Sequence, residues 1–381
     1  MNYTKLGNFE AICLIVILFI NHIVLNLPQI ILDNSGSASI LNCIYIFILI
    51  LIFTIIFTKL LKKFTGLDII DISEYLGGKF LKVLIGLVCI IYLITETAFL
   101  TRMFSKNLLL LYFNNYPLAF FLFIFLFIGI LANFIGRKSI IKSNTIITPL
   151  ALISIAITFI FVVDQFRFEH SLPLFANGTD KIFLYGASNI FAFNGLFFLF
   201  FISPLLNKKE ETSKVAFISV LICGILLILA IATLVFAFSD IYYISRLSPL
   251  YFIIVNSKLN GFLERPELIF IFIWALALMS FISISLMFCI NIFRKLTNIE
   301  EKNSKPLAIM FSCFIFVIAL VIDNVFDLEM VANAFYKYGS LILIFGVFTI
   351  ILIAANIKKR KYKNIDSNNK IQAKEMEDKI K

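Results

Sequence analysis

Residues 9–31 read FEAICLIVILFINHIVLNLPQII, and this stretch decides the fold. It is long enough to cross the hydrocarbon core of a bilayer, which takes about 20 apolar residues in a helix. Three polar residues, Asn21, His22 and Asn26, nevertheless lie at membrane depth, and Pro28 follows them. Because lipid offers no hydrogen-bond partners and proline removes a backbone donor, the pattern predicts a discontinuous helix that is broken between Asn21 and Asn26. No small-residue cleavage site follows, so we expect a retained helix and not a signal peptide.

The chain as a whole is rich in apolar segments of similar length. Of its 381 residues, 61% are apolar and only 15% are charged, which leaves too little polar surface for a soluble protein and too much apolar surface for a disordered one. The sequence therefore predicts an all-α polytopic membrane protein with ten transmembrane helices. The expected helices are 9–31, 40–61, 81–104, 117–134, 144–163, 183–206, 215–238, 268–293, 306–325 and 338–357.

A second interruption lies in the sixth segment, where residues 185–204 read YGASNIFAFNGLFFLFFISP. Interruptions in helices one and six of ten predict two five-helix repeats of opposite topology, residues 8–164 and 183–357, with a ligand site near the bilayer midplane. Two simpler explanations stay open at this point. Pro28 could only kink a helix end, and Gly195 could serve close helix packing.

Lysine and arginine set the expected orientation. Most of the 33 basic residues fall on the N-terminus, the even-numbered connections and the tail 358–381, which places both termini in the cytoplasm. The net charge of +10 then reflects topology, and we expect no nucleic-acid partner. We interpret the tail as an anchor on the anionic lipid bilayer rather than a docking motif. Two short surface helices are also expected, one at 68–76 inside and one starting at Pro249 outside.

The sequence contains no pattern for a metal, a cofactor or catalysis. His22 and His170 are far apart, and the six cysteines stand singly in apolar runs, where they are expected to pack as small core residues. There is no phosphate-binding loop or nucleophile elbow. We therefore expect neither a cofactor nor a metal, and an intramembrane enzyme ranks last among the three functional classes considered.

Three stretches carry a resemblance to a known family. They are LNLPQIILDNSGSAS (25–39) with the following KKFTGLDIIDISEYLGGKFLKVLIGLVCIIYLI (62–94), FNGLFFLFFISPLLNKKEE (193–211), and SPLYFIIVNSKLNGFLERPELIFIFIWALA (248–277) with Glu264, Arg265, Glu267 and Trp274. Over residues 5–357 the chain resembles the spore germination permeases, the B subunits of germinant receptors (GerAB/GerKB type) within the amino acid permease superfamily.

The resemblance implies a leucine-transporter-like fold of ten helices and a nutrient-sensing role at the inner membrane of a dormant endospore. It also implies two partners, a germinant receptor A subunit believed to form a pore and a lipoprotein C subunit. The chain departs from the pattern at Asn21 and His22, where amino acid permeases usually carry small residues, so the identity of the ligand does not carry over. The alternative is a gradient-driven amino acid transporter. The fifth helix lacks the central lysine that some proton-dependent permeases use, which leaves that coupling mode unsupported.

The two breaks define a candidate site for a small amino-acid-like nutrient. Backbone amides around Val24 and Leu25 would face a ligand carboxylate, and carbonyls near Phe191 to Phe193 would face an ammonium group. Two alternatives remain open, a neutral Glu96 that bonds a neighbouring helix and a His22 that local carbonyls satisfy. The predicted ligand-binding residues are Asn21, His22, Val24, Leu25, Phe191, Phe193, Asn194 and Gly195, with Glu96 and Ser280 as less certain neighbours.

Overall fold

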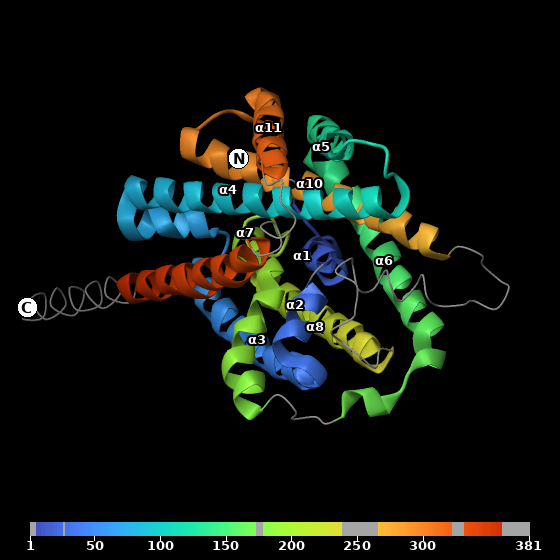
Figure 1. The fold of residues 1–381 in the computed structure, drawn as a ribbon. Coiled ribbons are helices and arrows are strands. Elements are labelled where there is room, and N and C mark those ends of the chain that lie inside the picture. The colour runs from blue at the N-terminus through green and yellow to red at the C-terminus, as the bar shows by residue number, and fades with distance from the viewer. Residues whose placement is uncertain (1–4, 26, 173–177, 238–265, 322–330, 360–381) are drawn as a thin grey trace, which may run out of the picture.

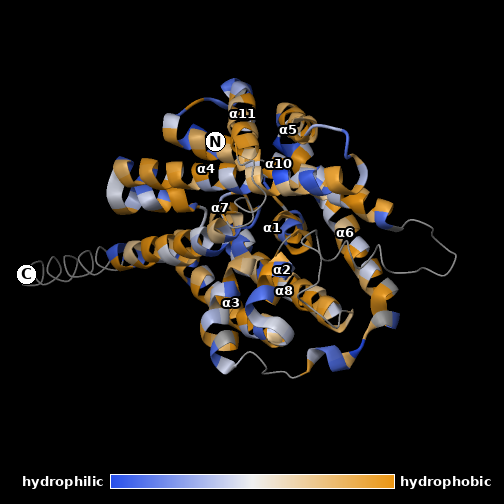
Figure 2. Ribbon diagram, viewed as in Figure 1, coloured by the Kyte–Doolittle hydropathy of each residue, from blue (hydrophilic) through white to orange (hydrophobic). Residues whose placement is uncertain are grey.

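The computed structural model describes residues 5–25, 27–172, 178–237, 266–321 and 331–359. Eight helices in these ranges are long and apolar enough to cross a membrane, and two shorter apolar helices, Asn8–Val24 and Lys305–Val321, join them. These ten helices follow the same order as the ten predicted segments, so the all-α polytopic architecture is confirmed. Figure 2 shows the corresponding distribution, with hydrophobic residues along the helices and hydrophilic ones concentrated toward their ends and connections.

Figure 1 shows the helices, which are numbered in chain order. The α-helices are α1 (Asn8–Val24), α2 (Leu27–Ser35), α3 (Ser39–Leu61), α4 (Ile69–Tyr112), α5 (Leu118–Ile135), α6 (Arg137–Val162), α7 (Leu199–Ile202), α8 (Thr212–Ala237), α10 (Pro266–Thr297) and α11 (Lys305–Val321). The tighter or wider helical turns are η1 (Gly36–Ala38), η2 (Lys62–Phe64), η3 (Val163–Gln165), η4 (Phe168–Ser171), η5 (Lys181–Tyr185), η6 (Gly186–Phe198), η7 (Lys209–Glu211) and η9 (Glu301–Asn303). The last helix spans Val331–Lys359 and includes η10 (Phe335–Gly339) and η11 (Leu341–Phe348).

Helix α1 forms the centre of the molecule. It packs against α6, α8, α10 and η6, and nearly all of its residues are buried, whichever face they lie on. A helix that is apolar all round needs such an enclosed position. Figure 1 shows α1 in the middle, with α4 crossing above it and α3 and α8 below. Peripheral helices instead expose large apolar side chains, such as Phe123 of α5, as a lipid-facing surface requires.

The first predicted segment is broken, as expected, near the end of the predicted interval 21–26. Helix α1 continues through Asn21 and His22 to Val24, Leu25 leaves helical geometry with φ −78° and ψ −85°, and α2 begins at Leu27. Pro28 then sits in the first turn of α2, where its missing N–H removes no intrahelical bond. The proline therefore starts the second half-helix, and the break precedes it. Asn26 lies outside the described residues.

The sixth segment is interrupted as well, by a kink at Phe193. From Gly186 to Phe198 the chain winds as a tight 3₁₀ helix, and Phe193 departs from helical geometry with φ −98° and ψ 29°. The kink thus falls inside the predicted interval 191–195. Gly195 serves a different purpose from the predicted opening of the helix, because a Cβ atom placed on it would lie 3.4 Å from Cβ and 3.5 Å from N of Phe19. Its small size lets α1 approach η6 closely. This agrees with the simpler explanation given above, in which Gly195 serves close helix packing.

The predicted inner surface helix is the first part of α4. Asp68 caps it by accepting the backbone N–H groups of Ile70 and Asp71, and Lys295 of α10 contacts both Asp68 (2.5 Å) and Asp71 (2.7 Å). The helix then bends at Gly77 and Gly78, where Gly78 has φ +68°, a conformation that glycine adopts without strain. A 44-residue helix therefore consists of a short surface arm and a long membrane-crossing part.

The end of the last helix is hydrogen-bonded to the segment between the end of α3 and the bend in α4. Lys358 Nζ donates to the carbonyls of Tyr75 (2.8 Å) and Leu76 (3.1 Å), and Lys359 Nζ donates to the carbonyl of Lys63 (2.5 Å). The rest of the predicted basic tail, residues 360–381, lies outside the described residues. The same holds for the surface helix predicted at Pro249 and for Glu264 and Arg265.

Candidate functional site

Three polar side chains from distant parts of the sequence meet at the centre of the apolar core. His22 in the last turn of α1, Glu96 in α4 and Asn194 in η6 are all buried, with Glu96 only 1% exposed. His22 Nε2 lies 3.1 Å from Glu96 Oε1, while Asn194 Nδ2 lies 3.0 Å from that oxygen and 3.2 Å from the imidazole nitrogen. We call these three residues the polar triangle.

The geometry of the polar triangle requires a proton between His22 and Glu96. Asn194 Nδ2 donates to Glu96 Oε1, and its second N–H donates to His22 Nε2 only where that nitrogen carries no hydrogen. Two acceptors without a proton would repel each other at 3.1 Å, so either the carboxyl group or the imidazole nitrogen carries one.

Several buried polar atoms around the polar triangle have unused bonding capacity. Glu96 Oε2, Asn194 Oδ1 and the hydroxyl of Tyr336 have no hydrogen-bond partner among the described residues. Tyr336 packs edge-on against the imidazole ring of His22, with ring centroids 5.2 Å apart. A buried polar group without a partner costs about 1–3 kcal/mol, so a cluster of them indicates a site that receives a polar ligand or water.

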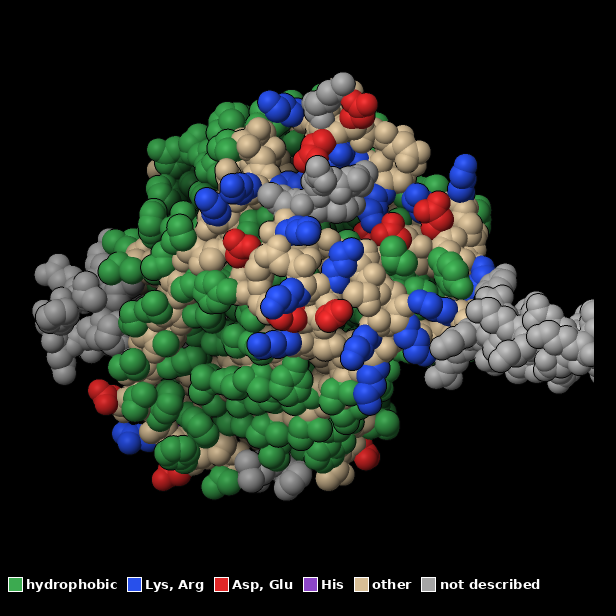
Figure 3. Space-filling view, turned by 180° about the vertical axis from the view of Figure 1, so that it is seen from behind, with side chains coloured by type: hydrophobic (Ala, Val, Ile, Leu, Met, Phe, Trp, Pro, Cys, Tyr) green, Lys and Arg blue, Asp and Glu red, His purple; other side chains and the backbone are tan. Residues whose placement is uncertain are grey.

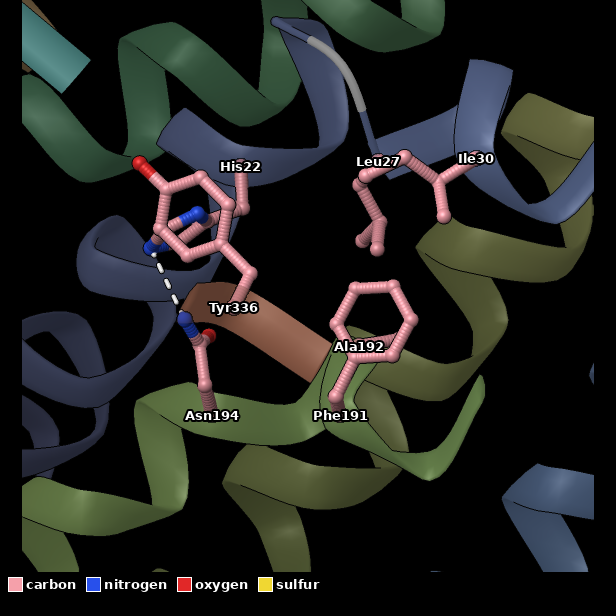
Figure 4. A pocket seen from close by; sticks show the side chains of 7 residues that line it. All are labelled: His22, Leu27, Ile30, Phe191, Ala192, Asn194 and Tyr336. Atoms are coloured by element: carbon pink, nitrogen blue, oxygen red, sulfur yellow. Dashed lines mark hydrogen bonds between the residues drawn. The ribbon is translucent and has the colours of Figure 1, made fainter. Parts of the chain in front are cut away.

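A small cavity opens from the polar triangle toward the break in the first segment. Its lining divides into a polar end, with His22, Asn194 and Tyr336, and an apolar end (Figure 4). The cavity volume is about 10 Å³, which holds about one water molecule and is too small for an amino acid. The described arrangement is therefore a closed one, and a larger ligand enters only if lining side chains move. The apolar end is formed by Leu27, Ile30, Phe191 and Ala192.

Two of the predicted site residues hold helices together instead of lining the cavity. The amide group of Asn21 donates to the carbonyl of Ile17 at 2.8 Å and to that of Ala277 at 3.2 Å, which ties α1 to α10. Ser280 donates to Asn144 Oδ1 at 3.1 Å and ties α10 to α6. Both polar groups are satisfied by protein, and neither bonds to the polar triangle.

The predicted roles of Val24 and Leu25 need correction. They belong to the end of α1 and to the break, not to the start of the outer half-helix, because α2 begins only at Leu27. Both residues line a separate apolar hollow of about 30 Å³ between α4 and α10, next to Trp274. The N-terminal amides expected near them are instead those of the first turn of α2, and Leu27 lines the central cavity.

The predicted residues of the sixth segment divide between two sides. Phe191 and Asn194 line the central cavity. Phe193 instead stacks on Phe19, with ring centroids 5.3 Å apart, and on Phe47 at 6.5 Å. Phe193 therefore belongs to the packing of η6 against α1 and α3, as Gly195 does.

A chain of asparagine side chains connects α2, η6 and α3 beside the site. Asn34 of α2 donates to Asn189 Oδ1 at 2.9 Å, Asn189 donates to Asn42 Oδ1 at 2.8 Å, and Asn42 donates to the carbonyl of Ile182 at 2.8 Å. The two half-helices beyond the breaks, α2 and the start of η6, are thus connected to each other and to α3. Movement of one of them must break this chain or carry the other along.

Two polar residues of the structure were not anticipated from the sequence. Tyr336 stands at the edge of the tenth apolar segment, where a tyrosine is typical of a membrane interface. Arg102 is buried in α4 and donates to the carbonyls of Ala319 and Leu320 at the end of α11, where a cation is favourable. An arginine inside the run TETAFLTRMF was the available signal for it.

Comparisons with known proteins agree with this architecture. The family model described as "Spore germination protein" matches residues 5–327. The chain is similar to "Spore germination protein B2" of Bacillus subtilis (strain 168), with 24% identity over 210 residues, which is 55% of this chain. The matched region spans only 57% of the length of that relative.

A solved structure shares the fold. It is the substrate-bound outward-open state of a Na⁺-coupled sialic acid symporter, which matches with a TM-score of 0.64 over 90% of this chain and 79% of that chain. Sequence identity is 14%, so the likeness concerns the fold alone. The ten described helices with their two irregular segments therefore form a leucine-transporter-like fold.

Proposed function

The chain belongs to the spore germination protein family, and from this premise we propose that it is the ligand-binding B subunit of a spore germinant receptor. The observation that carries the proposal is the polar triangle, which lies beside the break between α1 and α2 and has unused bonding capacity around it. The protein binds a small nutrient there and does not transform it chemically. It acts in the spore inner membrane, with both termini in the cytoplasm.

The cavity favours an amino-acid-like ligand. Its polar end offers acceptors for an ammonium group, because Asn194 Oδ1 has no partner among the described residues. Glu96, which accepts a hydrogen bond from the amide of Asn194, lies next to it. The first turn of α2 offers backbone amides and the positive end of the helix dipole to a carboxylate. Leu27, Ile30 and Phe191 provide an apolar end for a side chain. These three features together match a zwitterion with an apolar side chain.

Ligand binding would reach the partner subunits through the outer half-helices. An amino acid enters the cavity of about 10 Å³ only if lining residues move, and most of these residues belong to α2 and η6. The asparagine chain Asn34–Asn189–Asn42 makes such a shift a common movement of both elements. We propose that an A subunit and a lipoprotein C subunit respond to this movement.

A germination experiment tests this function. Spores that lack the chain should fail to respond to at least one of the 20 standard amino acids, and spores with Asn194→Leu should show the same defect. Asn356→Leu is a matched control, because Asn356 is also buried but bonds to Leu352 at the far end of the last helix. Normal germination of the deletion strain in every nutrient, together with lost amino acid uptake in growing cells, would instead establish the alternative, a gradient-driven amino acid transporter.

A further inference from the structure

A second and larger cavity lies on the lysine-rich side of the protein. It has a volume of about 250 Å³ and is enclosed by the end of α3, the turn that follows it, the turn after α7 and the start of α8. Five of its lining side chains carry hydroxyl groups, and two are lysines, Lys62 and Lys209. Figure 3 shows that charged side chains, mostly basic, gather on the face seen from behind, surrounded by hydrophobic surface.

The local chain geometry holds Lys209 over this cavity. Gly66 has φ +81°, and a Cβ atom there would lie 2.6 Å from Nζ and 2.7 Å from Cδ of Lys209, so the lysine side chain rests on the bare glycine. The backbone N–H of Gly66 donates to Ser203 Oγ at 3.1 Å, which ties this turn to the end of α7. The left-handed glycine thus leaves room for the exposed Lys209 side chain at the cavity wall.

The two lysines of the cavity form no ion pair within the described part of the chain. Neither Lys62 nor Lys209 has a carboxylate within ion-pair distance among the described residues, whereas the neighbouring Lys208 pairs with Glu211 at 3.7 Å. One acidic residue, Glu210, also lines the cavity, which leaves the lysines in excess. Helix α8 begins at Thr212 in the cavity wall and adds the positive end of a 26-residue helix.

The size and chemistry of the cavity select a class of ligand. The hydroxyl groups of Thr58, Thr65 and Thr212 already donate to backbone carbonyls. The hydroxyl groups of Ser203 and Ser213, the two ammonium groups and the helix N-terminus together match the oxygens of a phosphate group. Pockets for drug-sized molecules begin at about 300 Å³, so this one fits a single phosphate or a headgroup and not a nucleotide. Basic pockets between transmembrane helices on the cytoplasmic side are also where anionic lipid headgroups bind. We propose that this cavity binds a phosphate-bearing anion, which is either the headgroup of an anionic phospholipid or free inorganic phosphate.

The test compares two sources of phosphate on the purified full chain in nanodiscs. In the first arm, phosphatidylcholine nanodiscs are titrated with inorganic phosphate against chloride at constant ionic strength, and the thermal unfolding temperature is measured. In the second arm, part of the lipid is replaced by phosphatidylglycerol, and native mass spectrometry counts retained lipids. A response in the first arm identifies free phosphate, and one in the second arm alone identifies the headgroup.

Matched variants assign the response to the cavity. Lys62→Gln with Lys209→Gln should weaken binding at least about tenfold, because two charge-assisted hydrogen bonds are lost. Lys63→Gln with Lys208→Gln removes the same charge from adjacent residues that do not line the cavity, and it should keep binding within about twofold. Glu210→Gln should strengthen binding, which a variant that merely unfolds cannot do. No response in either arm, or an equal loss in both double variants, would overturn the proposal, while amino acid binding at the central cavity is unaffected by either result.

Discussion

Replacing Glu96 by glutamine removes the carboxylate from the centre of the site and keeps the shape of the side chain. The amide introduced by this substitution can still bond His22 and Asn194, with the amide of Asn194 turned to present its oxygen, and this arrangement needs no shared proton. We therefore expect normal folding of Glu96→Gln and a free energy of unfolding no lower than that of wild type, since the substitution also ends the burial of an unpartnered carboxylate oxygen.

The effect on the proposed ligand follows from the change in one hydrogen bond. A bond between an ammonium group and a carboxylate contributes about 1.5–3 kcal/mol, and a bond between uncharged partners about 0.5–1.5 kcal/mol. The loss of roughly 1–1.5 kcal/mol weakens binding of an amino acid by about 5- to 12-fold. An analogue without the amino group lacks this bond, so its affinity should stay the same in both proteins.

Isothermal titration on purified protein measures both ligands against wild type and Glu96→Gln. Glu74→Gln is the control for charge, because Glu74 lies on the surface arm of α4 and pairs with Lys82 at 2.8 Å. The reasoning fails if the amino acid and its desamino analogue lose affinity equally, since Glu96 would then act on the shape of the cavity. It fails as well if Glu96→Gln binds the amino acid as tightly as wild type does.

Three further predictions concern packing, acidity and topology. Gly195→Ala should unfold close to the wild-type temperature, whereas Gly195→Leu should lose about 1–3 kcal/mol in a thermal unfolding assay because its side chain meets the backbone of Phe19; equal stability of the two would contradict the close approach of α1. Burial raises the pKa of Asp68 to about 6 from its ordinary value of 3.8, in spite of Lys295, so the folded state holds a proton between about pH 4 and pH 6 that the unfolded state has lost. Its contribution to stability therefore falls as the pH rises through that window, so the unfolding temperature of wild type should decrease relative to that of Asp68→Asn; a difference between the two that does not change with pH would refute it. A cysteine at position 208 in a cysteine-free background should react with impermeant reagents only from the cytoplasmic side, and labelling from the outside alone would reverse the expected orientation.

The helices were predictable because their length is set by the bilayer, but their exact ends were not. A helix needs about 20 residues to cross lipid, and segments cut to that length placed Arg102 near the outer connection. In the structure α4 continues to Tyr112, which buries Arg102 against the end of α11. Pro28 correctly indicated a break, although proline is tolerated in the first turn of a helix, so the break itself lies at Leu25.

The candidate site was predictable as a set of residue types and not as a set of contacts. His22, Glu96 and Asn194 stood out because polar groups are costly inside an apolar segment. Asn21 and Ser280 stood out for the same reason, and only the rotation of α1 and α10 shows that they bond to protein across helices. Tyr336 could not be selected, because thirteen tyrosines occur in the chain and most positions suit a membrane interface equally well.

The small volume of the central cavity has a consequence for the speed of a response. With room for about one water molecule, the described arrangement excludes the proposed nutrient, which would bind only in a less populated open state. If that state makes up about 1% of the molecules, the apparent dissociation constant is about 100 times the intrinsic one. The observed association rate would then level off with rising nutrient concentration at the rate of opening. A brief pulse of nutrient, shorter than the opening time, would reach little more than the molecules that are open at that moment, about 1%, however high its concentration.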